Sequence, residues 1–498
     1  MRELRAQSWR KAQTLGGLGR SARALMPAPL KSAARWLYVK TPYSWRAGAT
    51  FRRTSALLER SRRWGKDRIL EYQMGRLKDV VLHAAANVPG YGRRFAEYGV
   101  TPSTIKTLED IRKLPCLTKD DLRTNPEWYV ARNIPRERLQ HVTSGGTTGA
   151  PVGFCHVRGY NEAVADAFKL SMWKRIGYSP ALRAIDLTST LEGNPAVPCA
   201  RRNVLYVSIA CLDADRFPSY AQTVRKFRPR FIIGFPSSVA MFAQLLRDSG
   251  TDGLDIKGVI TASEVLYEHQ RRYISERLGC RVLDWYGLAE YCGFASGCEG
   301  SDHYHFCPEA GYVELLDSDG LPVEKEGEEG EIVLTGFHNW ATPFIRYRTG
   351  DRGLLGKGAC KACGRSHTLL ERISGRLQEY LVAGNGRLVP NTALNLHSSV
   401  FDEVLCYQFY QDTPGEIVLS IVRKPSYDPA QTDLIRRTIE QRLGRKTALH
   451  IRFVDQIGKT GRGKHRFIVQ KLPIEKAPGG PCGQGRDTPA ISVTLEAT

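Results

Sequence analysis

The chain has 498 residues, of which 42% are hydrophobic and 25% charged, a balance typical of a folded globular protein. At this length we expect two to four domains, and no apolar run approaches the ~18 residues that a transmembrane helix needs. Twelve Cys are spread along the chain, which favours a reducing compartment over a disulfide-bonded scaffold. We therefore expect a cytoplasmic protein.

The first predicted segment is a basic N-terminal extension, residues 1–70. Residues 1–64 contain fifteen Lys or Arg but only Glu3 and Glu59 as acids, and so supply +13 of the net charge of +21. Its start leads into no apolar stretch of ~7–15 residues, so we do not expect a secretory signal. Two interpretations stay open: a solvated extension, or peripheral contact with an anionic membrane through residues such as Trp36. No nucleic-acid partner is expected, because no zinc-finger or helix-turn-helix pattern accompanies the charge.

Beyond the extension, helical and β-like patterns alternate. An amphipathic stretch over residues 71–98 predicts a helix that stops at Pro89 and Gly90, and Thr118 is a good N-cap for a second helix. The later runs are in turn β-like and helical: 231–235, 239–248, 258–260 and 269–278. Such alternation predicts βαβ units and a largely parallel sheet.

Three patterns follow towards the C-terminus. Residues 311–336 predict antiparallel strands joined at the turn sequence DSDG. Residues 401–471 form another α/β stretch, and residues 476–498 are rich in Gly and Pro, which predicts a disordered tail.

The sequence TSGGTTGAP at residues 143–151 has many hydroxyl groups and glycines but no apolar side chain before Ala150. It lacks the Walker pattern GxxxxGK[ST]. Its amides and hydroxyls suit the phosphates of ATP, yet runs of Ser, Thr and Gly are also common as ordinary turns. Composition alone leaves both interpretations open.

Four later segments settle this choice, because together with TSGGTTGAP they resemble, in order, the motifs of adenylate-forming enzymes, the acyl-CoA synthetase superfamily. They are residues 284–290 (DWYGLAE), 346–351 (RYRTGD), 372–376 (RISGR) and 461–464 (GRGK). The segments NVPGYGRRF, LPCLTKDDLR, GFPSS and YQFYQ resemble the phenylacetate-CoA ligase family, and within it the branch associated with capsular polysaccharide genes.

The resemblance implies an α/β fold in two parts: a large N-terminal adenylate-forming domain with βαβ layers, residues 71–376, and a small mobile α+β C-terminal domain, residues 377–475. It implies an ATP-dependent carboxylate–CoA ligase. A carboxylate attacks the α-phosphorus of ATP, pyrophosphate leaves, and coenzyme A then displaces AMP from the acyl-adenylate. The partners would be a small carboxylic acid and CoA; no oligomeric state is implied.

The resemblance also assigns site residues. The phosphates of ATP would be held by Ser144, Gly145, Gly146, Thr147, Thr148 and Gly149. Thr148 and Glu290 would position Mg²⁺, which prefers oxygen ligands, and the catalytic Lys464 would reach the α-phosphate. Asp351 would accept both ribose hydroxyls, supported by Arg372. The residues beside the rest of the nucleotide would be Ser263, Glu264, Tyr286 and Gly287.

Two departures from the family pattern bear mainly on the second half-reaction. Ala150 stands where many members carry Lys, and Gln378 falls on the usual hinge position. Two alternatives therefore stay open. One is an adenylating ligase that passes the acyl group to an amine or hydroxyl of a sugar or lipid intermediate. The other is a nucleotide-binding homologue without catalysis.

A separate pattern predicts a structural zinc site. Cys360 and Cys363 form a C-x₂-C knuckle, and Cys298 and His305 lie upstream, which makes the four N/S ligands that a closed zinc site needs. The alternative ligands are His303, Cys307 and His367. Ordinary buried thiols are the other interpretation. Such a zinc would staple the RYRTGD segment onto the sheet that carries Glu290.

Overall fold

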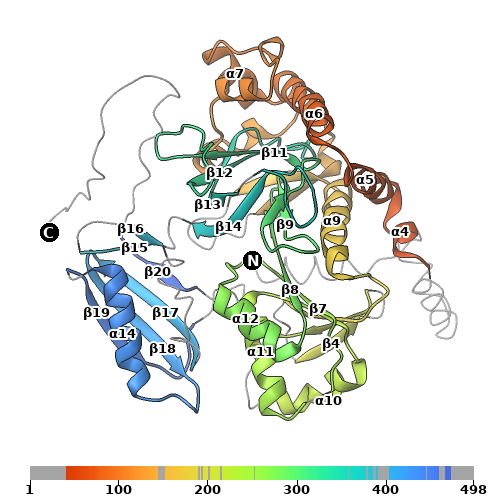
Figure 1. Cartoon of the computed structure of the whole chain (residues 1–498). Helices are drawn as coiled ribbons and strands as arrows, with labels where there is room; N and C mark the ends of the chain where they lie inside the picture. Colours follow the sequence, from red (N-terminus) through yellow and green to blue (C-terminus); the bar gives the residue numbers. More distant parts are fainter. Residues whose placement is uncertain are drawn as a thin grey trace.

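The structure is a computed structural model of the chain (Figure 1). It describes residues 41–143, 152–188, 191, 194–199, 202–212, 216–251, 253–356, 358–376, 380–384, 388–390, 403–444, 446–458 and 466–472. Several expectations lie outside these ranges: the extension before residue 41, the loop 144–151, Gln378, Lys464 and the tail 476–498.

A 12-stranded sheet forms the core of the large domain, in the order β11-β12-β13-β14-β10-β9-β8-β7-β6-β3-β5-β4. Its strands are β3 (Ala184–Leu187), β4 (Ala196–Cys199), β5 (Val204–Val207), β6 (Phe231–Gly234), β7 (Gly258–Ala262), β8 (Arg281–Gly287), β9 (Phe294–Ser296), β10 (Tyr304–Phe306), β11 (Gly311–Leu316), β12 (Glu329–Gly336), β13 (Tyr347–Leu355) and β14 (Leu369–Arg376). A separate two-stranded sheet pairs β1 (Leu139–Thr143) with β2 (Gly153–Val157), on either side of the loop 144–151.

Within the 12-stranded sheet, as far as the structure describes it, only β5, β3, β6, β7 and β8 run parallel to one another. The expectation of a largely parallel sheet therefore holds for this half alone. Parallel neighbours need a crossover, usually a helix, and the described residues between β8 and β14 contain none, so those strands pair antiparallel. The antiparallel pair expected over residues 311–336 is confirmed as β11 and β12.

Helices cover both faces of the parallel half. α10 (Phe217–Phe227), α11 (Pro236–Asp248) and α12 (Glu268–Leu278) share one apolar cluster with β3, β5, β6 and β7. α9 (Tyr160–Trp173) packs on the opposite face through Leu170 and Trp173. Successive side chains of a strand point to opposite faces, so these strands are buried on both. The predicted βαβ units are confirmed.

The N-terminal helices lie along one edge of the molecule (Figure 1). They are α4 (Tyr43–Arg46), α5 (Gly48–Ser61), α6 (Lys66–Asn87) and α7 (Pro89–Glu97); α8 (Lys119–Thr124) follows them in the chain. The predicted stop at Pro89 is the junction of α6 and α7, because proline is tolerated in a first helical turn. Thr118 caps α8 in a capping box with Asp121, as expected. Short 3-10 turns span Pro102–Thr104, Glu109–Lys113, Pro126–Tyr129, Arg136–Arg138, Lys174–Ile176 and Ile209–Cys211.

The structure corrects the predicted boundary of the basic extension. α5 lies within the range assigned to it, yet Phe51 and Leu58 are each 5% exposed and share a hydrophobic cluster with α9. These side chains lie on one helical face, and the arginines lie on the other. Charge counting across this segment missed its apolar face, and residues 48–61 belong to the folded large domain.

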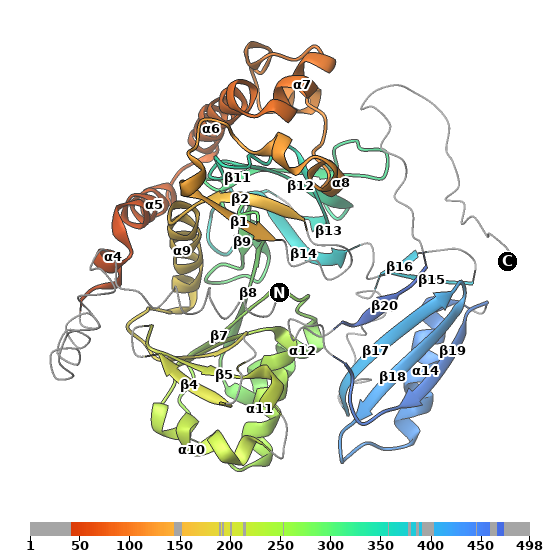
Figure 2. The same ribbon diagram turned by 180° about the vertical axis from the view of Figure 1, so that it is seen from behind.

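The small domain has a four-stranded sheet in the order β19-β18-β17-β20, covered by α14 (Ala430–Leu443). Its strands are β17 (Val404–Thr413), β18 (Glu416–Arg423), β19 (Ala448–Phe453) and β20 (Ile468–Gln470), with the pair β15 (Tyr380–Val382) and β16 (Leu388–Pro390) beside them. Figure 2 shows this domain next to α12 and away from α5 and α6. Among the described residues, no helix is both long and apolar enough to span a bilayer.

Candidate active site

The predicted nucleotide residues gather at the carboxyl ends of the parallel strands. Ser263 and Glu264 follow β7, Tyr286 and Gly287 end β8, and Glu290 stands three residues farther on. In open α/β sheets this edge is where ligands bind. The strand order therefore brings together residues that sequence analysis could only place separately.

Local backbone geometry marks the same edge. Ser263 has a φ of 71°, a left-handed conformation that non-glycine residues rarely adopt. Glu264 next to it accepts a hydrogen bond from the backbone N–H of Ser237, in the first turn of α11, at 3.1 Å. A Cβ on Gly287 would meet the ring of Trp285 at 2.6 Å, so this approach of the chain requires glycine.

Tyr286 and Asp351 form the first bond between the DWYGLAE and RYRTGD segments. The Tyr286 hydroxyl donates to Oδ2 of Asp351 at 2.8 Å. Burial, with the nearby Asp351 carboxylate, holds the pKa of Tyr286 well above its usual value, so the phenol keeps the proton that it donates. Asp351 is 6% exposed. The carboxylate predicted to bind ribose is thus oriented by a neutral donor.

Tyr347 and Glu290 form the second bond. The hydroxyl of the fully buried Tyr347 donates to Oε1 of Glu290 at 2.8 Å. Glu290 is 4% exposed, and its charge adds to burial in raising the pKa of the Cys292 thiol. The bond from Tyr347 orients this carboxylate, and carboxylate oxygens are ligands that a hard cation such as Mg²⁺ prefers.

Arg346 anchors the start of the RYRTGD segment. Its guanidinium lies 1% exposed and pairs with both carboxylate oxygens of Glu314 at 3.1 Å. It also donates to the backbone oxygen of Leu114 at 2.7 Å. Its φ of 48° is another left-handed non-glycine conformation. These contacts hold the residue that directly precedes β13, the strand on which Tyr347 and Asp351 lie.

The RYRTGD turn itself is held by two further contacts. Glu331 accepts from the N–H of Gly350 at 3.1 Å, and Lys119 donates from Nζ to the backbone oxygen of Thr349 at 2.5 Å. Sequence analysis did not single out Lys119. The only signal was its place in the family-like segment LPCLTKDDLR, because nothing local indicates a distant partner.

The strand register separates Arg372 from Asp351 along the ladder, and the expected support of Asp351 by Arg372 stays a prediction. β13 and β14 pair Asp351 with Arg376, and Arg372 stands opposite Leu354. Two irregularities, between Arg352 and Gly353 and between Leu354 and Leu355, shift the register along this ladder. The exposed Arg372 is therefore three positions along the strand from Asp351.

The four predicted zinc ligands come together. The ligand atoms of Cys298, His305, Cys360 and Cys363 all lie within 4.8 Å of one another, and the sulfurs of Cys298 and Cys360 are 3.9 Å apart. His305 is fully buried, and neither ring nitrogen has a hydrogen-bond partner among the described residues. Burial lowers its pKa to about 3, which keeps the imidazole neutral and able to bind a metal.

None of the three alternative ligands belongs to this group of four. His303 is exposed, Cys307 packs with Phe51 and α9, and the His367 ring lies 6.0 Å from that of His305. An ion pair holds the two ligand-bearing loops together, since Arg365 donates to both oxygens of Glu299 at 2.7 and 2.8 Å.

Comparison with known proteins follows the two-domain division. Residues 124–341 match the family model of AMP-binding enzymes, and residues 381–471 match the CapK C-terminal domain. The phenylacetate-coenzyme A ligase of Escherichia coli is 32% identical over 339 residues, which are 65% of this chain and 75% of that protein. Protein CapK of Staphylococcus aureus is 22% identical over 422 residues, 81% of this chain and 90% of that protein.

Solved structures share the fold. A 2-hydroxyisobutyryl-CoA ligase in the postadenylation state has a TM-score of 0.66 at 21% identity, covering 80% of this chain and 88% of that one. The same ligase in the thioesterification state, with 2-HIB-AMP and CoA, has a TM-score of 0.55 at 22% identity, covering 82% and 91%.

Proposed function

Since this chain belongs to the phenylacetate-CoA ligase family of adenylate-forming enzymes, in its CapK branch, and is an AMP-forming ligase, we propose that it activates a small carboxylic acid with ATP and transfers the acyl group to coenzyme A. The observation that carries the proposal is the reciprocal pairing of two segments. Each gives one phenol and one carboxylate to the other, through Tyr286 to Asp351 and Tyr347 to Glu290.

In the first half-reaction an oxygen of the substrate carboxylate attacks the α-phosphorus of ATP. A new P–O bond forms as the bond to the β-phosphate oxygen breaks, so pyrophosphate leaves with its electron pair. The protein's task is to place the reactants and to hold the negative charge of the transition state. Asp351 would bind the ribose hydroxyls, and Lys464 and the loop from Ser144 to Gly149 would hold the phosphates.

Mg²⁺, when bound, would offset charge on the phosphate oxygens. Glu290 fits this ion because it is a buried carboxylate, a hard oxygen donor that Tyr347 orients. Thr148, from the loop 144–151, would be its second protein partner. Through Mg²⁺, Glu290 would fix the position of the phosphates relative to the end of β8.

Zinc is proposed as a structural ion of the same domain. Two sulfurs bound at ~2.3 Å to a tetrahedral zinc lie about 3.8 Å apart, which supports zinc where Cys298 and Cys360 are 3.9 Å apart. Four protein ligands leave no open position, so the ion would do no chemistry. It would tie the loop after β9 to the segment between β13 and β14.

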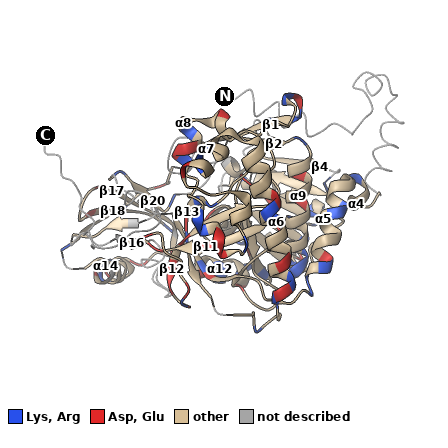
Figure 3. Ribbon diagram, turned by 90° about the horizontal axis from the view of Figure 1, so that it is seen from above, with Lys and Arg blue, Asp and Glu red and all other residues tan. Residues whose placement is uncertain are grey.

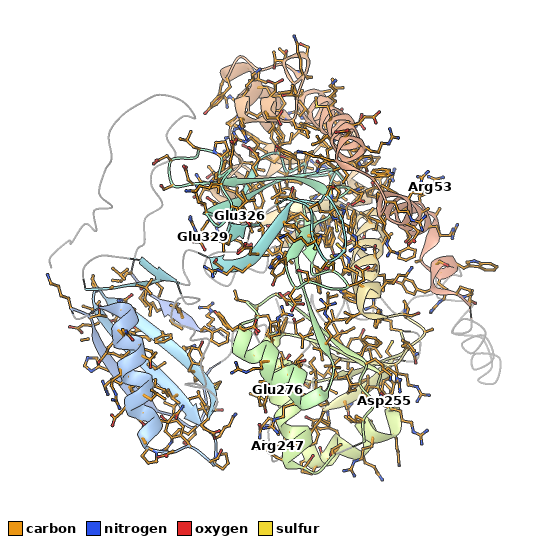
Figure 4. All side chains as sticks on the ribbon, in the orientation of Figure 1. Arg53, Arg247, Asp255, Glu276, Glu326 and Glu329 are labelled. Atoms are coloured by element: carbon orange, nitrogen blue, oxygen red, sulfur yellow. The ribbon has the colours of Figure 1, made fainter. Side chains whose placement is uncertain are left out.

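The alternative acceptor, an amine or hydroxyl of a sugar or lipid intermediate, is favoured by one surface. Arg52, Arg53 and Arg60 are exposed on α5, and Trp45 beside it is 71% exposed. The ribbon of this helix carries blue Lys and Arg positions in Figure 3, and Arg53 lies at the outer edge in Figure 4. A basic surface with an exposed indole fits an anionic membrane, where such an intermediate would be met. A homologue without catalysis would not need Glu290 and Asp351 so well oriented.

The test is release of pyrophosphate and AMP across a panel of aromatic, hydroxylated and fatty acids, with and without CoA. The proposal expects acid-dependent turnover that needs CoA and is lost in Lys464→Ala. Pyrophosphate release that is indifferent to CoA would favour the alternative acceptor. ATP binding without turnover on any acid would contradict both.

A further inference from the structure

An aromatic contact joins the large domain to the small one. Tyr267 stands at the N-terminus of α12, yet its side chain belongs to the hydrophobic cluster of the small domain. Its ring meets that of Phe467 edge to face, with centroids 4.7 Å apart and planes at 86°, a favoured aromatic geometry. Tyr267 is only 4% exposed, and its packing with the small domain contributes to that burial.

Phe467 is fixed on its own side of the contact. Its backbone oxygen accepts from the N–H of Phe409 on β17 at 2.7 Å, and the ring of Tyr407 lies 5.2 Å away. The backbone oxygen of Arg466 accepts from Nε2 of Gln408 at 2.9 Å. The Phe467 ring is therefore a rigid part of the small domain.

A second contact supports the same domain arrangement. Nζ of Lys424, at the end of β18, lies 5.0 Å from the ring centroid of Tyr273 on α12. This cation–π contact and the Tyr267 contact are six residues apart in the sequence, somewhat less than two helical turns. Two separated contacts define an orientation, whereas one would leave the small domain free to pivot.

The sequence places functional residues on both sides of the Tyr267 contact. Ser263 and Glu264, at the end of β7, precede Tyr267 by four and three residues. Lys464 precedes Phe467 by three residues, and a three-residue segment spans at most ~11 Å. Seating Phe467 on Tyr267 therefore limits the distance between Lys464 and the nucleotide edge of the sheet.

We propose that Tyr267 and Phe467 are positioning residues for adenylate formation: their contact holds the small domain in the orientation that delivers Lys464 to ATP. The proposal rests on the proposed function, because the role of Lys464 is part of it. The contact must part when the small domain turns for acyl transfer to CoA. Its loss therefore affects the first half-reaction selectively.

The test compares Tyr267→Ala with Tyr267→Phe, which keeps the ring, and with Glu276→Ala, an exposed change on the same helix. Acid-dependent ATP–pyrophosphate exchange measures the first half-reaction. Single-turnover transfer from the purified acyl-adenylate to CoA measures the second. Solution X-ray scattering of each variant without ligands reports the domain arrangement independently of activity.

The proposal expects Tyr267→Ala to lose at least about tenfold in exchange, to keep transfer within about twofold, and to scatter as a more extended particle. Tyr267→Phe and Glu276→Ala should match the parent in all three. Equal loss of both half-reactions would reduce Tyr267 to a purely structural residue, and unchanged exchange and scattering would overturn the proposal. If no acid supports exchange in the parent chain, the proposed function fails, while scattering still decides whether the contact sets the domain arrangement.

Discussion

Tyr347 donates its hydroxyl hydrogen to Glu290 at 2.8 Å, across 57 residues of sequence. Four residues farther along β13, Asp351 accepts from Tyr286, which stands four residues before Glu290. The two bonds therefore cross between the same pair of segments. Because each carboxylate is oriented by a phenol from the other segment, displacement of either segment disturbs both carboxylates together.

Replacing Tyr347 by Phe should weaken the binding of Mg²⁺ more than the binding of the nucleotide. The change removes the donor from Glu290 while it keeps the buried ring, and a hydrogen bond to a charged group contributes about 1.5–3 kcal/mol. We expect the Mg²⁺ concentration for half-maximal pyrophosphate release to rise on the order of tenfold. Tyr98→Phe, an exposed tyrosine after α7, is the control. An unchanged Mg²⁺ requirement would show that Tyr347 does not orient a metal ligand.

The four-residue cluster predicts one tightly held zinc per chain. Metal analysis of the purified protein should give about one equivalent, and Cys363→Ser should lose it and lower the melting temperature, because binding energy at a structural site is folding energy. Cys280→Ser, a half-buried thiol outside the cluster, should keep both. Metal-free protein of unchanged stability would favour the interpretation as ordinary buried thiols.

The Asp284 carboxyl predicts a specific pH dependence of stability. Burial raises its pKa to about 6, although Thr261 and Tyr304 donate to it, against ~3.9 in an unfolded chain. Between these values the folded protein binds more protons, so the free energy of unfolding falls as the pH rises through this window.

The Asp284→Asn variant has no carboxyl group at this position, so its free energy of unfolding should not fall through this window for the same reason. The stability of the parent relative to Asp284→Asn should therefore fall by on the order of 1 kcal/mol from pH 5 to pH 8, as measured by urea unfolding. Asp319→Asn, on the exposed turn after β11, is the control. A difference that is constant with pH would mean that Asp284 is already ionised at pH 5.

The basic face of α5 predicts salt-sensitive binding to anionic vesicles. Arg52, Arg53 and Arg60 would each contribute about 1 kcal/mol near an anionic surface. The triple change to Gln should therefore lower binding to phosphatidylglycerol vesicles on the order of hundredfold. The control removes the same charge from the exposed side chains of Lys226, Arg247 and Arg277. An equal loss of vesicle binding in the two triple variants would indicate a general charge effect. Absence of vesicle binding by the parent protein would rule out the membrane interpretation.

Much of the fold follows from local sequence. The alternation of β-like and helical runs predicted β6, α11, β7 and α12, and Thr118 predicted the start of α8, because periodicity and capping are local properties. The motif residues Tyr286, Glu290 and Asp351 were singled out by resemblance.

Other relationships depend on tertiary structure. The position of Arg372 three residues along the ladder from Asp351 depends on the register of β13 with β14, which no single strand encodes. Lys119 meets its partner Thr349 across 230 residues. Tyr267 belongs by sequence to the large domain, but its side chain packs in the hydrophobic cluster of the small one. Each required the strand order and domain arrangement to be known.

The most direct measurement is acid-dependent exchange of labelled pyrophosphate into ATP, which reports adenylate formation without any acceptor. Parent protein, Glu290→Gln and Asp351→Asn should be compared across the acid panel, with folding checked by circular dichroism. The account predicts exchange with at least one acid and a loss of on the order of a hundredfold in both variants. Exchange that survives in both variants would contradict the assignment of the paired carboxylates to the nucleotide and its metal.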